Sequence, residues 1–321
     1  MNKAQIGIGT YSIHSSLEPI LQEALNKGIS LIDTAPNYRE NVAQKEIGGF
    51  LKERNEFSLL HGNSLKITTK VGFFAAKDKE YLLRNSIIDT KNTHHCHNIQ
   101  EKYIKYQVTQ NLEELGVSTI EGVFIHNPEA QLNVSERGLL LRNLQKVFEV
   151  LEEFVAQGKI KKYGVATWSG FGTPSKAPAF SVKELYELAR QICSDHHFSL
   201  IQTPISLVNC HHISSYFQQK GPLFEAQEFG VKVYASSPLH GGSLPKVVDQ
   251  KLANYLGTNL TKAQACLLFS MSAPVIDTVL TSPSNLSQLN DSVKVKYLES
   301  IEKNIIEKIV SMINTRKPKI L

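Results

Sequence analysis

Short runs of apolar residues alternate along the chain with longer segments in which apolar residues recur at helical spacing. The short runs span three to five residues each, and several are bounded by glycine or by a charged residue. Runs of this length predict buried β-strands. The eight predicted strands are Gln5–Gly9, Leu31–Asp33, Lys66–Lys70, Gly122–His126, Tyr163–Ala166, Leu200–Thr203, Val231–Ala235 and Thr278–Leu280.

The longer segments predict amphipathic helices that pack one face. In Glu18–Asn26, for example, Leu21, Ala24 and Leu25 recur at three- and four-residue intervals, which is the spacing of one helix face. The predicted helices are Glu18–Asn26, Gln44–Lys52, Tyr103–Leu115, Leu139–Gln157, Val182–Ile192, Leu223–Phe229, Thr261–Ser272 and Leu286–Val293, with an extra C-terminal helix at about Glu299–Ile313.

The turns from helix to strand are short. The segments "LNKGIS", "AQGKI" and "EFGVKV" each end a helix with glycine and begin a strand at once, as repeating β-α units do. Eight such units favour an α/β fold of the closed (β/α)8 TIM-barrel type, with residues 1–321 as a single domain. The alternative, an open doubly wound sheet, is less favoured because "GIGTY" lacks the G-x-G-x-x-G fingerprint.

Five long segments with few helix signals each follow a predicted strand. In a (β/α)8 barrel such segments meet at the C-terminal face, where barrel enzymes build their sites. The pattern therefore predicts long loops on one face and a structural face opposite. The segments are Phe73–His97, Asn127–Arg137, Trp168–Phe180, Ile205–Gly221 and Ser237–Asp249.

Composition narrows the class of protein. The chain has 321 residues, 41% hydrophobic residues and a net charge of +5 spread over many lysines. No apolar run approaches the length of about 18 residues that spans a membrane, and no arginine-rich or aromatic-interleaved basic stripe suggests nucleic-acid binding. The N-terminus has no signal-peptide core, and four separated cysteines form no C-x-x-C pair. We therefore expect a cytoplasmic protein with reduced thiols that binds neither membrane nor nucleic acid.

Ionisable residues stand at the ends of three consecutive predicted strands. Asp33 ends the second strand, Lys70 the third and His126 the fourth, and Tyr38 lies in the loop after Asp33. Each alone has a structural explanation, but together they form a plausible catalytic set. A nearby ammonium lowers the pKa of a phenol from its usual value of about 10, a carboxylate holds the ammonium charged, and an imidazole can hydrogen-bond a substrate oxygen. This set would protonate a carbonyl oxygen that gains charge on hydride transfer.

The chain resembles the aldo-keto reductase superfamily. The segments "GIGTY", "GISLIDTAPNY", "ITTKVG", "VFIHNPE", "KIKKYGVATW", "SLIQTPISL", "ASSPLHGGSL" and "VLTSPSNLSQL" stand in that family's order, and "FIHNPE" and "YGVATWSGF" are most similar to a bacterial branch. The resemblance implies an NAD(P)H-dependent carbonyl reductase. By this resemblance, Tyr38 is the general acid/base and Lys70 adjusts the pKa of Tyr38. Asp33 supports Lys70, and His126 orients the substrate carbonyl.

The resemblance also implies a nicotinamide cofactor bound along the barrel rim, with NADPH preferred over NADH. The family's Ser-Asn pair after strand five is Ala166-Thr167 here, and its stacking aromatic after strand seven is Ser236. The basic residue that the family often has for the adenosine phosphate is missing, and Lys246 in the preceding loop is the candidate to replace it. The cofactor residues implied are Thr10, Tyr11, Asp33, Thr167, Gln202, Ser236, Pro238, Leu239, Gly241, Ser282, Ser284 and Gln288.

Trp168, Phe73 and His126 are the predicted substrate-pocket residues, for a small carbonyl compound whose identity the loops do not reveal. The "HHCH" segment, His94–His97, invites a metal hypothesis. Because adjacent residues of an extended segment point to opposite sides, we instead expect a loop over the site and no metal. Two alternatives stay open: a catalytically silent, cofactor-binding scaffold, and a lyase or isomerase that uses Lys70 as a Schiff-base amine. Neither reading specifies an oligomeric state.

Overall fold

Eight parallel strands form a closed barrel in the computed structural model, which describes residues 3–13, 15–55 and 65–315. Neighbouring strands follow each other in sequence order, and β1 closes the barrel by pairing with β8. The (β/α)8 prediction is therefore confirmed. The strands are β1 (Gln5–Gly9), β2 (Leu31–Asp33), β3 (Lys66–Val71), β4 (Gly122–His126), β5 (Tyr163–Ala166), β6 (Phe198–Pro204), β7 (Lys232–Ser236) and β8 (Ile276–Thr281).

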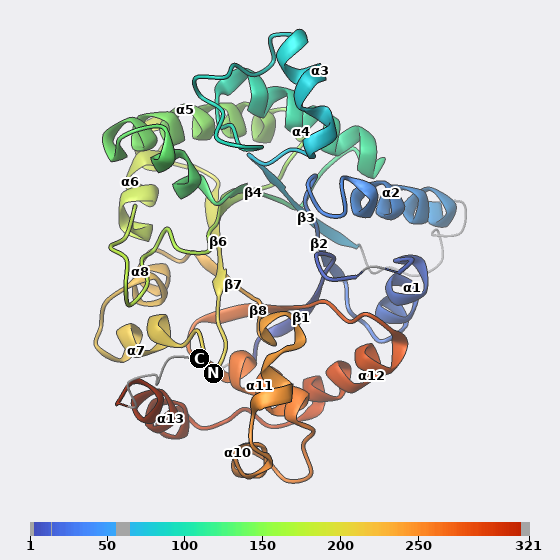
Figure 1. The fold of residues 1–321 in the computed structure, drawn as a ribbon, viewed down its shortest axis with the longest axis vertical. Helices are drawn as coiled ribbons and strands as arrows, with labels where there is room; N and C mark the ends of the chain where they lie inside the picture. Colours follow the sequence, from blue (N-terminus) through green and yellow to red (C-terminus); the bar gives the residue numbers. More distant parts are fainter. Residues whose placement is uncertain (1–2, 14, 56–64, 316–321) are drawn as a thin grey trace.

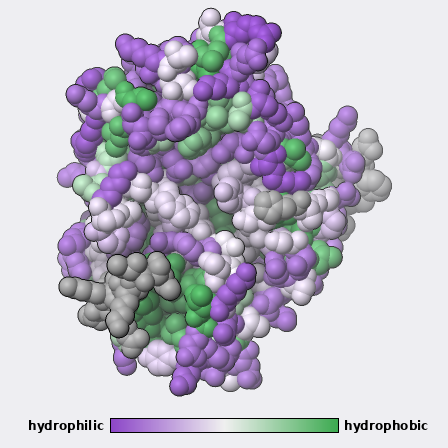
Figure 2. Space-filling view, in the orientation of Figure 1, coloured by the Kyte–Doolittle hydropathy of each residue, from purple (hydrophilic) through white to green (hydrophobic). Residues whose placement is uncertain are grey.

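Helices surround the strands on all sides (Figure 1). Most apolar side chains are buried between the barrel and this outer layer, and the face seen in Figure 2 is mostly hydrophilic with separate apolar patches. The α-helices are α1 (Glu18–Asn26), α2 (Val42–Asn55), α3 (Lys79–Arg84), α4 (Glu101–Leu115), α5 (Arg137–Ala156), α6 (Val182–Ile192), α7 (His211–Phe217), α8 (Pro222–Glu228), α9 (Leu244–Val247), α10 (Gln250–Leu256), α11 (Lys262–Ser272), α12 (Leu286–Lys294) and α13 (Lys303–Thr315). Short 3-10 helices are η2 (Ala76–Asp78), η3 (Pro128–Asn133), η4 (His240–Gly242) and η5 (Val295–Tyr297).

Local sequence explains where several helices begin and end. Ser181 and Glu184 form a capping box at α6, and Thr261 and Gln264 form one at α11. Each box satisfies backbone N–H groups that a helix start leaves without partners. Gly116 ends α4 with φ 63°, a left-handed conformation that glycine adopts at little cost. Gly116 thus lets the chain leave α4 and begin β4 within a few residues.

A second apolar cluster fills the inside of the barrel. Its members come from six strands and are Leu31, Phe124, Ala166, Leu200, Tyr234 and Leu280. Glycine is required beside it, because a Cβ at Gly164 would lie 1.8 Å from the carbonyl oxygen of Leu200. The barrel is thus a packed core with no pore, and chemistry is confined to its ends.

The loops on the C-terminal face carry more helix than the sequence predicted. The segments after β3, β6 and β7 contain α3, α7, α9 and α10, each only four to seven residues long. Helices this short show too few turns for a clear apolar period. The C-terminal helix was predicted to begin at about Glu299 but begins at Lys303, because Ile301 packs in the core and its N–H donates to Ser272 Oγ at 2.9 Å.

No helix in the part of the chain that the structure describes is both long and apolar enough to span a membrane.

Candidate active site

Asp33 and Lys70 form a buried ion pair at the ends of β2 and β3. Lys70 Nζ lies 2.5 Å from Asp33 Oδ2 and donates to the carbonyl oxygen of Thr34 at 3.0 Å. The side chain of Lys70 is only 1% exposed and that of Asp33 only 4%. Burial lowers the pKa of Lys70, but Asp33 and Tyr38 outweigh burial and the pKa is raised from 10.5. The ammonium therefore stays charged at neutral pH, as the sequence predicted.

The second oxygen of Asp33 is also occupied. Thr68 Oγ1 donates to Oδ1 at 2.8 Å, and Gln202 Nε2 donates to the same atom at 3.2 Å. Three side chains from β3 and β6 thus hold the carboxylate in place. Gln202 was expected to be a cofactor residue, but its side-chain nitrogen is directed at Asp33.

Tyr38 lies against this pair in the turn after β2. Its N–H donates to the carbonyl oxygen of Ala35 at 3.1 Å, and Lys70 Nζ lies 5.0 Å from its ring centroid. The next three residues, 39–41, all have positive φ, between 52° and 70°. Non-glycine residues rarely adopt this conformation, and such strain is common at functional sites. The turn returns the phenol to the mouth of the barrel.

The direction of the Tyr38 pKa shift corrects the sequence-based expectation. Lys70 lowers the pKa, but burial of the ring is the larger effect, and the pKa is raised from its usual value of 10.0. A sequence shows the nearby lysine and does not show how completely the ring is buried. Tyr38 therefore carries its proton at neutral pH in this state of the protein.

His126 ends β4 and faces the same space. Its ring centroid lies 6.0 Å from that of Tyr38 and 5.1 Å from that of Phe73. Burial, followed by the charge of Lys70, lowers its pKa well below 6.5, so the imidazole is neutral. His126 Nδ1 is buried and has no hydrogen-bond partner among the described residues. The structure thus brings together Asp33, Tyr38, Lys70 and His126.

Three aromatic residues predicted for the substrate pocket or the cofactor site lie around this group. Tyr11 is 67% exposed and meets the ring of Tyr38 edge-on at 5.1 Å. Trp168 is 54% exposed, and its backbone N–H donates to Asn127 Oδ1 at 3.0 Å. Phe73 packs edge-on against His126. Exposed indole and phenol rings beside a buried polar group are suited to hold the body of a small organic molecule.

Thr167, a predicted cofactor residue, is engaged within the protein. Its hydroxyl donates to Glu129 Oε1 at 2.7 Å and accepts from the N–H of Gly170 at 2.6 Å. Glu129 also accepts from the N–H of Ser169 at 3.0 Å. Glu129 ties the loop after β4 to the loop after β5, and sequence reasoning missed it. The only signal was its place two residues after Asn127 in "HNPE".

The diphosphate end of the predicted cofactor track is open. Gly241 and Gly242 have φ 63° and 83° and are exposed, and a Cβ at either would meet nothing within 4 Å. Pro238 and Leu239 precede them, and Ser236 ends β7. Backbone N–H groups in left-handed conformations can approach an anion closely. Of the two glycines, Gly242 already donates its N–H to the carbonyl oxygen of Leu239 at 2.9 Å.

A second anion-compatible element follows β8. Ser282 lies beside the end of β1, since a Cβ at Gly9 would be 2.9 Å from its hydroxyl oxygen. Gln288 Oε1 accepts from the N–H of Ser284 at 2.8 Å, at the N-terminus of α12. The first N–H groups of a helix lack intrahelical acceptors and favour negative charge. Thr10, by contrast, is fully buried and donates to Thr34 Oγ1 at 2.9 Å, which supports the β1–β2 junction.

The "HHCH" segment is a tight turn, where an extended segment was expected. His94 and His97 exchange backbone hydrogen bonds of 3.0 and 2.9 Å. Among residues 3–13, 15–55 and 65–315, no group of three or more His, Cys, Asp or Glu side chains is arranged to hold a metal ion. His97 lies fully buried beneath the site, which the sequence did not indicate.

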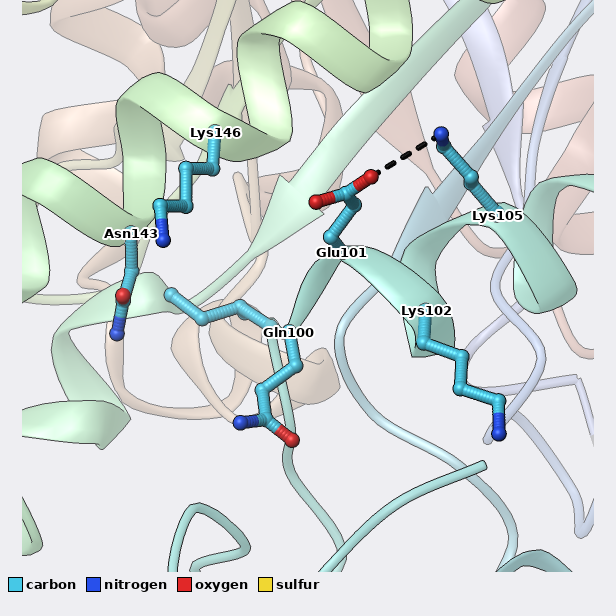
Figure 3. A pocket seen from close by; sticks show the side chains of 7 residues that line it. Gln100, Glu101, Lys102, Lys105, Asn143 and Lys146 are labelled. Carbon is cyan, nitrogen blue, oxygen red and sulfur yellow. Dashed lines mark ion pairs between the residues drawn. The ribbon is translucent and has the colours of Figure 1, made fainter. Parts of the chain in front are cut away.

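A separate pocket of about 550 Å³ lies outside the barrel, between α4 and α5 (Figure 3). Glu101 and Lys105 in its lining form an ion pair of 3.1 Å, and Lys102 donates to the carbonyl oxygen of Ser86. None of the predicted site residues lines this pocket. The residues predicted from the sequence to carry the chemistry therefore lie outside this pocket.

Comparison with known proteins establishes the family. The family model described as "Aldo/keto reductase family" matches residues 5–313. With this barrel and this match across nearly the whole chain, the protein belongs to the aldo/keto reductase family, whose named relatives are oxidoreductases.

Among curated proteins, the chain is 29% identical over 157 residues to D-threo-aldose 1-dehydrogenase of a Pseudomonas species, covering 46% of this chain and 43% of that protein. It is 25% identical over 224 residues to 6-dehydroglucose reductase of Agrobacterium fabrum, covering 70% of this chain and 61% of that protein. The chain thus matches about half the length of these relatives.

Solved structures show the same fold at lower identity. The glycerol dehydrogenase of Gluconobacter oxydans superposes with a TM-score of 0.69 at 19% identity, covering 98% of this chain and 93% of that one. A holo aldo-keto reductase of Bacillus halodurans gives a TM-score of 0.66 at 16% identity, with the same coverage. These likenesses concern the barrel alone.

Proposed function

We propose that this protein reduces an aldehyde or ketone to an alcohol, with Tyr38 as the proton donor. The observation that carries the proposal is the buried Asp33–Lys70 pair directly beside a protonated phenol and a neutral imidazole. A nicotinamide cofactor, when bound, supplies hydride to the carbonyl carbon. Everything else in the reaction is assigned to side chains of this chain.

Tyr38 and Lys70 share the proton-transfer step. The raised pKa of Tyr38 keeps the phenol protonated at neutral pH, so it can donate as negative charge develops on the substrate oxygen. Donation leaves a phenolate, which the adjacent Lys70 ammonium stabilises. Asp33 keeps that ammonium charged and oriented. A buried charge beside the phenol favours the charged product of proton transfer more than the neutral reactant, as catalysis requires.

His126 is proposed to position the carbonyl oxygen. Its Nδ1 is buried without a partner, and a buried acceptor without a partner is tolerated more readily than a buried N–H without one. We therefore place the ring proton on Nε2. A neutral imidazole in this form donates one hydrogen bond to a substrate oxygen and adds no second positive charge beside Lys70.

The cofactor is proposed to lie along the rim from Tyr38 toward Gly241 and α12. NADPH is the preferred candidate, with Lys246 of α9 as the partner of the adenosine phosphate, and NADH is the alternative. The open backbone at Gly241 supports the phosphate end. At the other end, Thr167 and Gln202 must exchange internal hydrogen bonds for contacts to the carboxamide.

We propose the substrate only as a chemical class. The relatives named as an aldose dehydrogenase and a dehydroglucose reductase make carbonyl sugars the first compounds to test, together with simple aldehydes.

We also propose that residues 1–321 form a single domain, because α13 packs against α7 and α11. The free thiols Cys96, Cys193, Cys210 and Cys266 support a cytoplasmic location.

The test is oxidation of NADPH or NADH, followed by absorbance, with a panel of aldehydes and sugars. Tyr38→Phe should lower kcat by about a hundredfold or more and leave the cofactor Kd unchanged. Tyr297→Phe, the same change at an exposed tyrosine, is the matched control and should behave like wild type.

A catalytically silent, cofactor-binding protein is the second candidate, favoured by the internal bonds of Thr167 and Gln202. Tight cofactor binding without turnover across the panel would support it. Reductive trapping of a substrate on Lys70 by borohydride would support Schiff-base chemistry instead. Either of these two results would refute the proposal that the protein is a carbonyl reductase.

A further inference from the structure

His97 is held in one tautomer by its surroundings. Gln131 Nε2 lies 2.8 Å from His97 Nδ1 and 3.2 Å from the carbonyl oxygen of His97. Only the amide nitrogen can face that carbonyl favourably, so the side-chain orientation of Gln131 is determined. An amide nitrogen can only donate, which makes His97 Nδ1 an acceptor. The ring proton must then be on Nε2.

The Nε2–H group of His97 is directed at the strand end that carries His126. It lies 2.9 Å from the carbonyl oxygen of His126 and donates to it. The ring of Phe73 packs edge-on against both imidazoles, with centroid distances of 4.5 Å to His97 and 5.1 Å to His126. His97 therefore reaches His126 by two routes, one through the backbone and one through an aromatic ring.

The loop that carries His97 is locked onto the end of β3. The N–H of Asn98 donates to the carbonyl oxygen of Gly72 at 2.9 Å, and the N–H of Phe74 donates to that of Cys96 at 3.0 Å. Gly72 has φ 119°, and a Cβ there would lie 2.9 Å from His97 Nε2. The close approach of the ring to the backbone therefore needs glycine at this position.

We propose that His97 is a positioning residue for His126 and sets where that imidazole stands relative to Tyr38. The inference rests on the proposed function, because His126 is assigned there to the substrate oxygen. His97 itself is fully buried and is assigned no contact with substrate or cofactor. Displacement of a catalytic group by about 1 Å can reduce the rate by about a hundredfold, so a residue that fixes the end of β4 has a large effect on turnover.

A purely structural buried histidine is the competing explanation. It would stabilise the loop after β3 without affecting the state of the His126 ring. The two explanations differ in spectroscopy as well as in kinetics. They also differ in what they predict for a variant that restores only the N–H donor at position 97: only the positioning role predicts that such a variant regains kcat.

Three variants separate the two explanations. His97→Phe keeps a flat ring and removes the donor, and His97→Gln restores an N–H donor near the position of Nε2. His95→Asn removes an exposed imidazole from the same turn, and asparagine tolerates the left-handed φ of 52° found there. Wild type and each variant are labelled with ¹⁵N-histidine for NMR and assayed for kcat and KM.

In wild type, we expect the His97 spectrum of a neutral ring protonated on Nε2. His97→Phe should shift the His126 ring signals and lower kcat about tenfold to a hundredfold, with the cofactor Kd unchanged. His97→Gln should return both toward wild type, and His95→Asn should leave both unchanged. Detection of the Nδ1–H tautomer of His97, or unaltered His126 signals and kcat in His97→Phe, would overturn the proposal.

The outcomes remain separable from those of the proposed function. If wild type reduces no carbonyl compound, the reductase assignment fails, while the NMR signals still test the link between His97 and His126. If His97→Phe does not fold, Gln131→Met provides a second route, since it keeps His97 and removes the side-chain donor that holds the Nδ1 side of its ring. Shifted His126 signals and a lower kcat in Gln131→Met support the proposal, and His126 signals and a kcat like those of wild type refute it.

Discussion

Removing one partner of the Asp33–Lys70 ion pair is expected to destabilise the barrel more than removing both. The pair is almost completely buried, with side chains 4% and 1% exposed. Three variants make a double-mutant cycle: Asp33→Asn, Lys70→Met, and the two together. Asparagine keeps an oxygen in place of Asp33 Oδ1, and methionine is close to the lysine stem in length without its charge.

The magnitudes follow from what each variant leaves behind. Lys70→Met leaves a buried carboxylate with only Thr68 and Gln202 as side-chain donors. Asp33→Asn leaves an ammonium facing an amide N–H₂. Breaking a buried ion pair in this way costs about 3–5 kcal/mol of unfolding free energy. The double variant buries no charge and keeps the acceptor for Thr68 and Gln202, so its loss should be about 1–2 kcal/mol.

The assay is urea unfolding followed by circular dichroism and by the fluorescence of Trp168, the only tryptophan. Coincident transitions are required before free energies are compared. The expected coupling energy is about 3 kcal/mol or more. A double variant that loses the sum of the two single losses within about 0.5 kcal/mol would refute the reasoning. Carbonyl reduction should be lost in all three variants, including the stable double variant.

Three further predictions concern other parts of the molecule. Gly48→Ala should lose about 1–3 kcal/mol of unfolding free energy, because the new Cβ would lie 2.0 Å from a carbonyl oxygen of α4. Gly49→Ala should gain about 0.5–1 kcal/mol, because its Cβ would meet nothing within 4 Å. Urea midpoints that rank the two variants the other way would contradict this. Burial lowers the pKa of His97 to about 4 and that of His212 to about 3, from 6.5. The unfolded chain therefore takes up these protons first, and stability should fall as pH drops from 6.5 toward 4, by about 3 kcal/mol for His97 alone. A His212→Asn variant should lose less over this range in the same unfolding assay, and an identical loss would count against the assignment. The raised pKa of Tyr38 predicts that kcat for reduction is constant from pH 7 to about 9 and falls at higher pH as the phenol loses its proton; a decline beginning near pH 7 would exclude Tyr38 as the acid.

Local sequence patterns were sufficient for the order of strands and helices. The strand limits of β1, β2, β4 and β5 were predicted to the residue, because apolar runs end sharply where the chain meets glycine or a polar rim. The short helices on the rim were missed, since four to seven residues contain too little periodicity to separate a helix from a loop.

Closure of the barrel follows from those same patterns, and closure places the strand ends at one rim. Asp33, Lys70 and His126 could therefore be grouped from the sequence alone. Their grouping needed only strand order, because parallel strands in a barrel present the same end to the same face. The chemical type of each residue then suggested its role.

The hydrogen-bond partners were decided only in the tertiary structure. Gln202 donates to Asp33 across 169 positions of sequence, and Glu129 engages Thr167 from a neighbouring loop. The protonation state of Tyr38 likewise depends on how completely its ring is buried, and the role proposed for His97 depends on the contact between the loop after β3 and the end of β4. A sequence determines which residues can reach the rim, but burial and pairing depend on contacts between distant segments, and these exist only once the barrel has closed.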